Sequence, residues 1–540
     1  FSDYNPKQSN DLIARSERIL NVISNRLNLI YEVDFPIDYW RCLLSVPIIS
    51  LTQSIFEKNK IIDECLDKNK MYNIDIIDKS FIPKFNSTRN IRSFLNSNLG
   101  HHILCSIILE NKKNFNLKLK KIKVNKIKYK INIFSNIIQY SELILDLIIS
   151  IFTNCLIFKI RGINLINKFR LKYVNNKKFK LNSTKNLYEK IKSVNKISIE
   201  KDKLDIETDK YDFQESIIIK NIFYFLPEFI FKNFKFNNLF NFYILNIFKL
   251  NRKKILIGGV LGGYDKFKFI AALLKLTSTK INIYQHGGYY GSSQNFTLMA
   301  YSEYFIADNF ITWGWSTHSK YNINTVKLPN PFISKLKLNN SYKNNKKFGE
   351  VIYITTETPL YGTNIGTVPH PFQFKKFNKD KIRILDILSN HYNKIFYRPY
   401  FNSDVLNNEI KYLKSKFEKI EIFYDKLDLS LNNFDIIILD HPSTLMNFTL
   451  GSNLPVLIYL NTSIWSFDQK FQKILSSLKK NNIIFDDITD LEKFIKLNKK
   501  SFKKIFENKN RKKEIDLYVN NYALNDKNWI FQWNKFINNY

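Results

Sequence analysis

The chain has 540 residues, and 44% of them are hydrophobic. That length exceeds one ordinary core, and that hydrophobic content excludes a wholly disordered chain, so we expect two domains with an insertion. The net charge of +35 allows a basic surface that attracts nucleic acid, phosphorylated sugars or anionic lipid headgroups. We attribute most of this charge to a compositional bias toward Lys, Asn and Ile.

The four cysteines are widely spaced and form no CxxC pair, so neither a zinc site nor a redox pair is indicated. Buried thiols in a reducing cytoplasm are expected. The most apolar run, Leu147 to Phe158, is shorter than the roughly 20 residues of a membrane span, and we predict a buried helix there. The start of the sequence has no signal-peptide pattern. We expect a cytoplasmic protein, with the inner face of the plasma membrane as an open alternative.

Residues 1–110 predict a mainly helical region, because Asp11–Leu29 and Tyr39–Phe56 carry apolar residues at helical spacing. From Asn111 to Lys130, Lys alternates with Leu, Ile, Val or Phe. This alternation predicts an exposed edge strand or a basic amphipathic surface, and we favour the solvated edge. The Lys- and Asn-rich sequence continues further and indicates a variable basic insertion at about 111–220.

From residue 250 onward, short apolar strands alternate with helices, which predicts a parallel α/β core at 250–335 within an N-terminal, acceptor-side domain of residues 1–335. After a Lys/Asn/Ser linker the pattern restarts and predicts a second, donor-binding α/β domain at 349–505. Helices within 506–540 are expected to pack back on the first domain. The predicted fold class is therefore α/β: two doubly wound Rossmann-like domains with a mainly helical N-terminal region and an insertion. The predicted strands are 254–259, 281–284, 310–315, 324–328, 350–355, 394–397, 419–423, 434–439, 455–460 and 482–485.

One candidate loop follows the strand at 281–284, where a parallel sheet would bind a ligand at its carboxyl edge. It contains His286 among three glycines, which let backbone approach a ligand closely. His286 would act as a base on an acceptor hydroxyl or donate a hydrogen bond to a phosphate. A turn whose histidine only caps the strand is the alternative. The other residues expected to line the cleft here are Gln285, Gly287, Gly288, Tyr290 and Gly291.

A second candidate loop follows the strand at 434–439 and reads Asp440-His441-Pro442-Ser443-Thr444. Ser443 or Thr444 would be the N-cap of the next helix, whose free N–H groups and dipole attract an anion. His441 would donate a hydrogen bond to a phosphate oxygen. A nucleotide leaving group would be neutralised there, although an ordinary capped helix is the alternative.

Four further candidates are weaker. Thr356 and Glu357 end the first strand of the second domain, and Arg398 ends another strand and would hold an anion. Asp265 begins a predicted helix; it is either the helix cap or an additional base. No pair of carboxylates resembling a DxD motif follows a strand. A metal-independent reaction is therefore favoured, with no cofactor expected.

At these motifs the chain resembles a family of surface-carbohydrate transferases encoded with O-antigen and lipopolysaccharide clusters, which have the two-domain GT-B architecture. Two of the matching segments, around the QHGG loop and the Trp313-Gly314-Trp315 sequence, are fairly specific together. The family usually has an extra strand ahead of Tyr39, so a truncated start is expected. The segments that carry the resemblance are 39–44 with Pro47, 226–228, 284–291, 307–315, Ser443-Thr444 and 453–455.

The chain departs from many members of that family at His441-Pro442. This pair is similar to the one with which bacterial sialyltransferases and Kdo transferases hold the phosphate of CMP. The resemblance implies an inverting glycosyltransferase that uses a nucleotide-activated sugar, with CMP as a candidate nucleotide, and a saccharide or lipid-linked acceptor. A polyol-phosphate transferase of the teichoic-acid type is one alternative. A basic protein that binds nucleic acid or a membrane surface is the other; contact with an anionic membrane is compatible with the enzyme, whereas specific nucleic-acid binding is not expected.

Overall fold

The computed structural model describes most of the chain. The described residues are 6–125, 133–153, 155–158, 160–172, 188–189, 191–192, 206–232, 234–247, 254–258, 264–277, 279–295, 297–339, 351–356, 369, 373–401, 406–427, 431–498 and 502–539.

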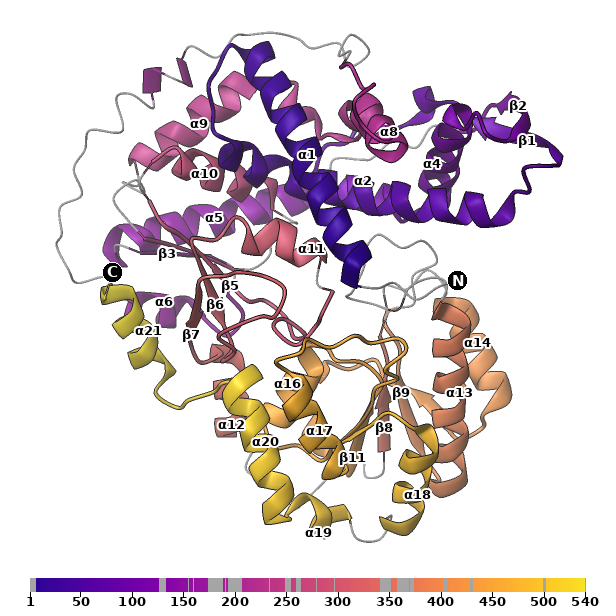
Figure 1. Cartoon of the computed structure of the whole chain (residues 1–540). Coiled ribbons are helices and arrows are strands. Elements are labelled where there is room, and N and C mark those ends of the chain that lie inside the picture. The colour runs from indigo at the N-terminus through magenta and orange to yellow at the C-terminus, as the bar shows by residue number, and fades with distance from the viewer. Residues whose placement is uncertain are drawn as a thin grey trace.

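The first part of the chain begins with helices and then forms a sheet (Figure 1). Its helices are α1 (Pro6–Tyr31), α2 (Ile37–Cys65), α3 (Thr88–Leu95), α4 (Asn98–Asn111), α5 (Ile133–Thr153), α6 (Leu165–Arg170), α8 (Phe213–Asn221), α9 (Phe234–Ile247), α10 (Asp265–Lys275), α11 (Thr297–Met299) and α12 (Pro331–Asn339). Its strands are β1 (Met71–Ile77), β2 (Asn116–Ile122), β3 (Cys155–Phe158), β4 (Lys254–Gly258), β5 (Ile281–Tyr284), β6 (Asn309–Thr312) and β7 (Thr325–Lys327).

The second part alternates strands and helices throughout, and the chain ends in three helices. Its strands are β8 (Val351–Ile354), β9 (Ile395–Arg398), β10 (Ile420–Ile422), β11 (Ile436–Leu439), β12 (Val456–Tyr459) and β13 (Ile484–Phe485). Its helices are α13 (Phe374–His391), α14 (Leu406–Lys416), α16 (Thr444–Gly451), α17 (Gln472–Lys480), α18 (Ile488–Asn498), α19 (Phe502–Phe506), α20 (Lys509–Tyr522) and α21 (Trp529–Asn538).

Both main sheets are parallel, which confirms the predicted α/β class, but their strand orders differ. The six-stranded sheet has the order β10-β9-β8-β11-β12-β13. Numbered from its own first strand this is 3-2-1-4-5-6, the order of a dinucleotide-binding fold, and the order reverses between β8 and β11. The loops that leave β8 and β11 therefore flank the position where such sheets bind their ligands.

The five-stranded sheet has the order β3-β4-β5-β6-β7, so its described strands follow one another in chain order. Each crossover moves in the same direction, and the described strands contain no reversal. This arrangement differs from the doubly wound sheet expected for the first half of the chain. Sequence alternation predicts a parallel sheet but not the direction in which each crossover turns.

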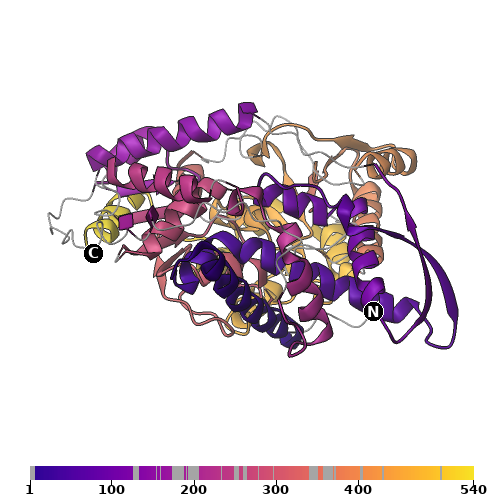
Figure 2. The same cartoon turned by 90° about the horizontal axis from the view of Figure 1, so that it is seen from above.

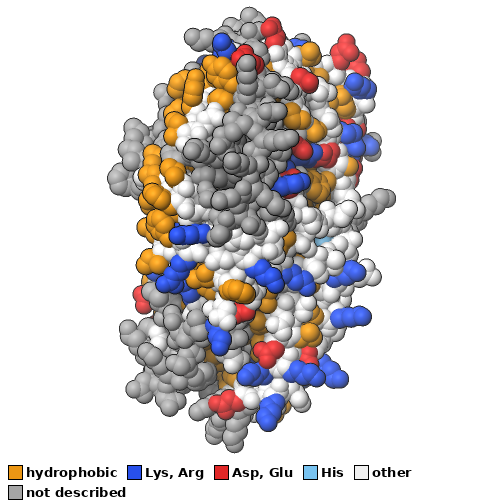
Figure 3. Space-filling model, turned by 90° about the vertical axis from the view of Figure 1, so that its left-hand side faces the viewer, with side chains coloured by type: hydrophobic (Ala, Val, Ile, Leu, Met, Phe, Trp, Pro, Cys, Tyr) orange, Lys and Arg blue, Asp and Glu red, His pale blue; other side chains and the backbone are white. Residues whose placement is uncertain are grey.

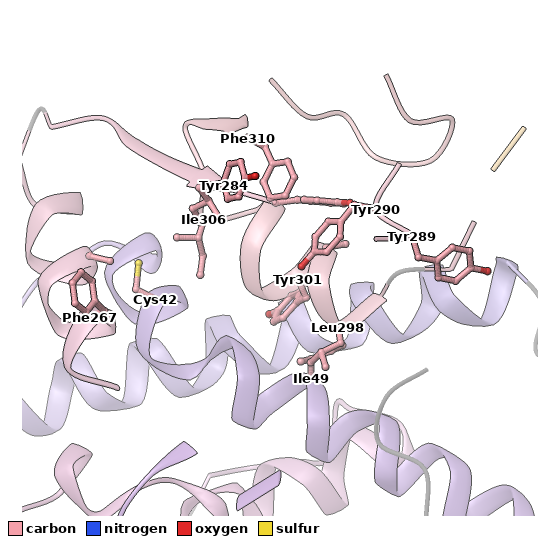
Figure 4. Packing of buried hydrophobic residues seen from close by; sticks show 14 of the residues in the cluster. Cys42, Ile49, Phe267, Tyr284, Tyr289, Tyr290, Leu298, Tyr301, Ile306 and Phe310 are labelled. Carbon is pink, nitrogen blue, oxygen red and sulfur yellow. The ribbon is translucent and has the colours of Figure 1, made fainter. Parts of the chain in front are cut away.

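Helix α2 is the central support of the first part, because most of its length is buried. It packs against α1, α4 and α10. Figure 4 shows Ile49 of this helix near Leu298 and Tyr301, with Tyr290 and Phe310 in the same core. The strands β1 and β2 form a separate parallel arm at the periphery (Figures 1 and 2). No side chain of β2 is buried, which agrees with the solvated edge predicted there; residues 126–130 of that prediction lie outside the described residues.

The two halves of the molecule share one buried hydrophobic cluster and also meet through backbone. Ser293 and Phe467 form an antiparallel bridge, and the Asp468 N–H donates to the Ser292 carbonyl at 2.8 Å. The final helix, α21, returns to the first sheet, where the Trp533 ring lies 5.4 Å from that of Tyr284. The core is therefore continuous across the junction.

The sequence predicted one buried helix for the apolar run from Leu147 to Phe158, and this prediction is wrong. It is divided between the end of α5 and the strand β3. The Thr153 hydroxyl donates to the carbonyls of Ile149 and Cys155, each at 3.0 Å, where the helix stops. Periodicity cannot separate a short buried strand from a buried helix, so pairing with β4 decides the outcome. Among the described helices, none is both long and apolar enough to cross a bilayer.

Candidate active site

The loops that follow β5 and β11 touch each other. The Gly288 N–H donates to the Thr444 hydroxyl at 2.8 Å. A Cβ atom added to Gly288 would lie 2.4 Å from the backbone carbonyl of Ser443. Only a residue without a side chain allows this approach. The contact therefore joins the carboxyl edge of the first sheet to the reversal point of the second.

Gln285 fixes the shape of the first loop from inside the protein. Its side chain is buried, and its amide nitrogen donates to the Gly287 carbonyl at 2.8 Å. Its amide oxygen accepts from the Trp313 backbone at 3.1 Å and from the Trp315 indole at 2.8 Å. Gln285, expected to line a cleft, is thus a positioning residue whose polar atoms face protein.

Close packing also explains Gly291, the last glycine of this loop. Its φ is +70°, and an added Cβ would lie 2.4 Å from the Trp315 ring. Positive φ and lack of space both favour glycine here. Gly291 therefore shapes the loop, and nothing in its contacts requires a ligand.

His286 belongs to a relay of three side chains. Its Nδ1 lies 2.8 Å from the Tyr290 hydroxyl and 3.3 Å from a Glu303 oxygen. The Tyr290 hydroxyl donates to Glu303 at 2.7 Å, so its oxygen can accept a hydrogen bond from the His286 Nδ1–H. Burial, followed by the Glu303 charge, raises the pKa of Tyr290 well above its usual value, so the phenol keeps its proton. In this tautomer the lone pair of His286 lies on Nε2.

His286 remains accessible within this arrangement. Its side chain is 33% exposed, whereas that of Glu303 is almost fully buried. Tyr290 reaches Glu303 through the hydrophobic core, where its ring stacks on Phe310 (Figure 4). An accessible imidazole oriented by a buried carboxylate is the arrangement that general-base catalysis requires.

Glu303 was not anticipated from the sequence. It lies in a π-helical turn, Ala300–Tyr304, that follows α11. Such turns are rare and occur often at functional sites. The usable sequence signal was a single acidic residue in the apolar segment from Leu298 to Ile306, because an unpaired carboxylate is seldom buried.

Asp440 and His441 form a second, deeper pair after β11. His441 Nδ1 lies 2.8 Å from an Asp440 oxygen, and a carboxylate can only accept, so Nδ1 carries the proton. The other Asp440 oxygen accepts from the hydroxyls of Tyr353 and Thr355, each at 2.6 Å. The His441 side chain is only 7% exposed. Its Nε2 is consequently the nitrogen left for a ligand.

The amino end of α16 differs from the open anion site that we expected. Ser443 is the N-cap, and its hydroxyl accepts from the Leu445 N–H at 3.1 Å, which confirms the predicted cap. However, the backbone of Gly288 packs against this helix start: a Cβ atom added to Gly288 would lie 2.5 Å from the Thr444 nitrogen.

The remaining candidates, Asp265 and Arg398, have no described hydrogen bond to His286 or His441. Both oxygens of Asp265 accept from Thr88, and Lys268 is 3.1 Å away, so Asp265 ties α10 to α3. The Arg398 guanidinium donates to the backbone carbonyls of Phe423 and Asp425. Burial lowers the pKa of Arg398, an effect that the Asp425 charge opposes. The described partners of Asp265 and Arg398 are therefore protein groups.

Thr356 follows Thr355 after β8 and is partly buried. Pro442 lies immediately before Ser443, the N-cap of α16. Glu357 lies outside the described residues. Across the part of the chain that the structure describes, no three His, Cys, Asp or Glu side chains gather as metal ligands would.

Residues 4–537 match the model of a family of transferases. The chain belongs to the LIC12162 family transferase group, and the match spans nearly its whole length. A search of curated proteins found no significant match.

Proposed function

We propose that this transferase is a glycosyltransferase of the GT-B type, with a nucleotide-activated sugar as donor. The observation that carries the proposal is the contact between the two loops, in which Gly288 bonds to Thr444. It brings together an accessible histidine at the edge of one sheet and a buried histidine at the reversal point of the other. Ligands of open α/β sheets bind at such edges.

In this proposal His286 activates the acceptor. Its Nε2 removes the proton from an acceptor hydroxyl while the oxygen forms a bond to the anomeric carbon of the sugar. Glu303 and Tyr290 hold the ring and stabilise the imidazolium that results. Attack opposite to the leaving group inverts the anomeric centre.

His441 acts on the donor side. As the bond between the anomeric carbon and the phosphate oxygen breaks, the nucleotide leaves with the electron pair. A protonated His441, held at Nδ1 by Asp440, donates from Nε2 to the phosphate oxygen that gains charge. The chain supplies this stabilisation from its own side chains, so the proposed step needs no metal or cofactor.

CMP is the first nucleotide to test, because the His441-Pro442 pair is similar to the one with which CMP-sugar enzymes hold the CMP phosphate. The proposed biological role is synthesis of a bacterial surface polysaccharide or lipopolysaccharide, with a saccharide or lipid-linked acceptor. Polyol-phosphate transfer would use the same base and the same phosphate site, so product chemistry must separate it. Nucleic-acid binding has less support, since acidic and apolar groups interrupt the basic ones on the face in Figure 3.

The test is to incubate the purified protein with radiolabelled nucleotide sugars and a lipid-linked or saccharide acceptor, and to analyse the product. We expect a new glycosidic bond and no phosphate transferred from the donor to the acceptor. His286→Gln should lower kcat by about 10²–10⁴-fold, as expected for loss of a general base. A phosphodiester product would establish polyol-phosphate transfer instead, and full activity of the variant would remove His286 as the base.

A further inference from the structure

Helix α5 is apolar on both of its sides, which is unusual for a helix at the surface. Leu143, Leu147 and Ile149 are buried on the side that packs against β3. The other side is exposed and has no cover in the described structure. Its large apolar side chains are Ile144, Leu145, Ile148, Ile151 and Phe152.

The short helix α6 extends this exposed surface. It adds Leu165, Ile166 and Phe169, and the Phe169 ring lies 6.4 Å from that of Phe152. We call these eight side chains of α5 and α6 the α5–α6 face. Each is between 41% and 65% exposed. Single exposed apolar residues are ordinary, but a contiguous group marks a surface that binds something. The apolar column along one side of Figure 3 belongs to this region.

Basic residues border the α5–α6 face. The sequence from 141 to 172 contains five Lys or Arg and only two Asp or Glu. Arg161, Arg170 and Lys172 are exposed. One of the two acids, Asp146, is buried against Lys168, so it contributes little negative charge to the surface. The exposed border is therefore positive.

A cavity of about 830 Å³ opens beside this face. It is lined by apolar groups such as Leu145 and Ile166, and its charged groups are two basic and two acidic side chains: Arg161, Lys168, Glu142 and Asp146. A cavity with both apolar and charged lining can accept a molecule that has an apolar part and a polar head.

We propose that the α5–α6 face docks on a lipid bilayer that carries anionic headgroups. An apolar strip with a basic border matches the boundary between acyl chains and negative headgroups. A second copy of the chain fits less well. In a two-fold dimer the same face of each copy meets the other, so the two basic borders would lie close together and repel each other.

Docking has a consequence that rests on the proposed function. Arg161 and Tyr264 follow β3 and β4, and His286 follows β5, the next strand of the same parallel sheet. Neighbouring strands lie about 4.8 Å apart. The bilayer would then adjoin the edge of the sheet that holds the proposed base, where a lipid-linked acceptor would arrive from the membrane.

The experiment is co-sedimentation of the full chain with vesicles, which measures binding without any transferase assay. We expect binding to vesicles containing phosphatidylglycerol, weaker binding to pure phosphatidylcholine, and loss of binding in high salt. The double variant Ile148→Asp with Phe152→Asp should weaken binding by at least roughly tenfold, because two apolar anchors are lost. The matched control is Leu497→Asp with Leu517→Asp, two exposed leucines of α18 and α20 in the other half of the molecule.

If the α5 variant folds poorly by circular dichroism, Arg170→Glu on the exposed border gives the same test, with weaker binding expected. The proposal is overturned if the wild-type chain stays in the supernatant with anionic vesicles, or if variants and control bind alike. It is also overturned if light scattering shows a dimer that the α5 variant dissociates, since a second copy would then be the occupant. A failure here leaves sugar transfer untouched, and a failed transferase assay leaves vesicle binding untouched.

Discussion

The loops after β5 and β11 each present a histidine whose Nδ1 is held by an acidic group, yet the two rings differ in access. His286 reaches Glu303 partly through Tyr290 and is 33% exposed, whereas His441 bonds directly to Asp440 and is 7% exposed. A base must meet a diffusing acceptor, but a group that stabilises a leaving phosphate works best where water is excluded. This difference in access is the basis for proposing different tasks for the two rings.

The two loops also leave sheets with different strand orders. The loop with His441 lies at the reversal of a 3-2-1-4-5-6 sheet, a geometry suited to a nucleotide. The loop with His286 leaves the middle of a sheet whose described strands run in chain order. Its described contacts with the other half include the hydrogen bond from Gly288 to Thr444.

Breaking that junction should have the largest effect. Gly288→Ala would set a methyl group 2.4 Å from the Ser443 backbone, which cannot move aside without shifting α16. We expect a loss of about 3 kcal/mol in stability and loss of activity, measured by thermal unfolding and by turnover. Gly287→Ala is the matched control, since its methyl would meet side-chain atoms and no backbone: the Thr444 hydroxyl at 3.1 Å, which can rotate away, and the Tyr290 ring at 3.8 Å, an ordinary contact. Equal unfolding temperatures for the two variants would contradict the contact.

Removing the orientation of His286 should have the next largest effect. Glu303→Gln takes away the charge that stabilises the imidazolium, and we expect kcat to fall by about 10²-fold with the donor KM unchanged. Tyr290→Phe should give a loss in the same direction, because it removes the hydroxyl between the two groups. Steady-state kinetics with a varied donor provide the measurement. A rise in donor KM with normal kcat would place Glu303 on the donor side instead.

A smaller loss is expected on the donor side from Asp440→Asn. The amide no longer favours a protonated His441, so the departing phosphate loses part of its stabilisation; we expect roughly a tenfold fall in kcat/KM for the donor. Thr355→Ser, which keeps the hydroxyl that bonds to Asp440, serves as the control. Unchanged kcat/KM in Asp440→Asn would mean that the pair has only a structural role.

The smallest expected effect is a pH dependence of stability that arises at the contact between the two halves. His318 is buried beside Ser293 and Asp468, and burial lowers its pKa, although the Asp468 charge opposes this shift. The folded state therefore binds this proton less readily than the unfolded chain, whose histidines titrate near pH 6.5. Stability should fall as pH drops below about 6.5 and be fully present above it.

The measurement for His318 is the unfolding temperature at pH 8 and at pH 5.5. We expect His318→Gln to reduce the decrease seen at low pH, by a change on the order of a few degrees or less. A variant with the same pH dependence as the wild-type chain would show that other groups cause the loss. Replacing His391, at the end of α13, controls for removal of one histidine.

The sequence predicted most of the sheet strands because buried parallel strands are short apolar runs that end at polar or glycine-rich loops. The predicted strand at 434–439, for example, is the strand β11. The sequence did not predict strand order in the first half or the division between α5 and β3. Both depend on which strands pair across long separations, and local periodicity does not encode that pairing.

The sequence likewise predicted only part of the candidate site. His286, His441 and the Ser443 cap lie in loops whose own composition marks them. Glu303 and Tyr353 were missed because only the folded chain brings them to those loops. The roles predicted for Arg398 and Asp265 stay predictions. The hydrogen bonds that the structure describes for them go to backbone carbonyls and to Thr88, and nothing in the sequence indicated these partners.

The division of tasks between the two histidines can be tested most directly by nucleotide binding. Calorimetry with CMP, CDP, UDP and GDP should find one that binds the wild-type chain and raises its unfolding temperature. His441→Ala should lose that binding, whereas His286→Ala should keep it while losing turnover. If no nucleotide binds, or if both variants bind it as the wild-type chain does, the donor site is not at the loop that follows β11.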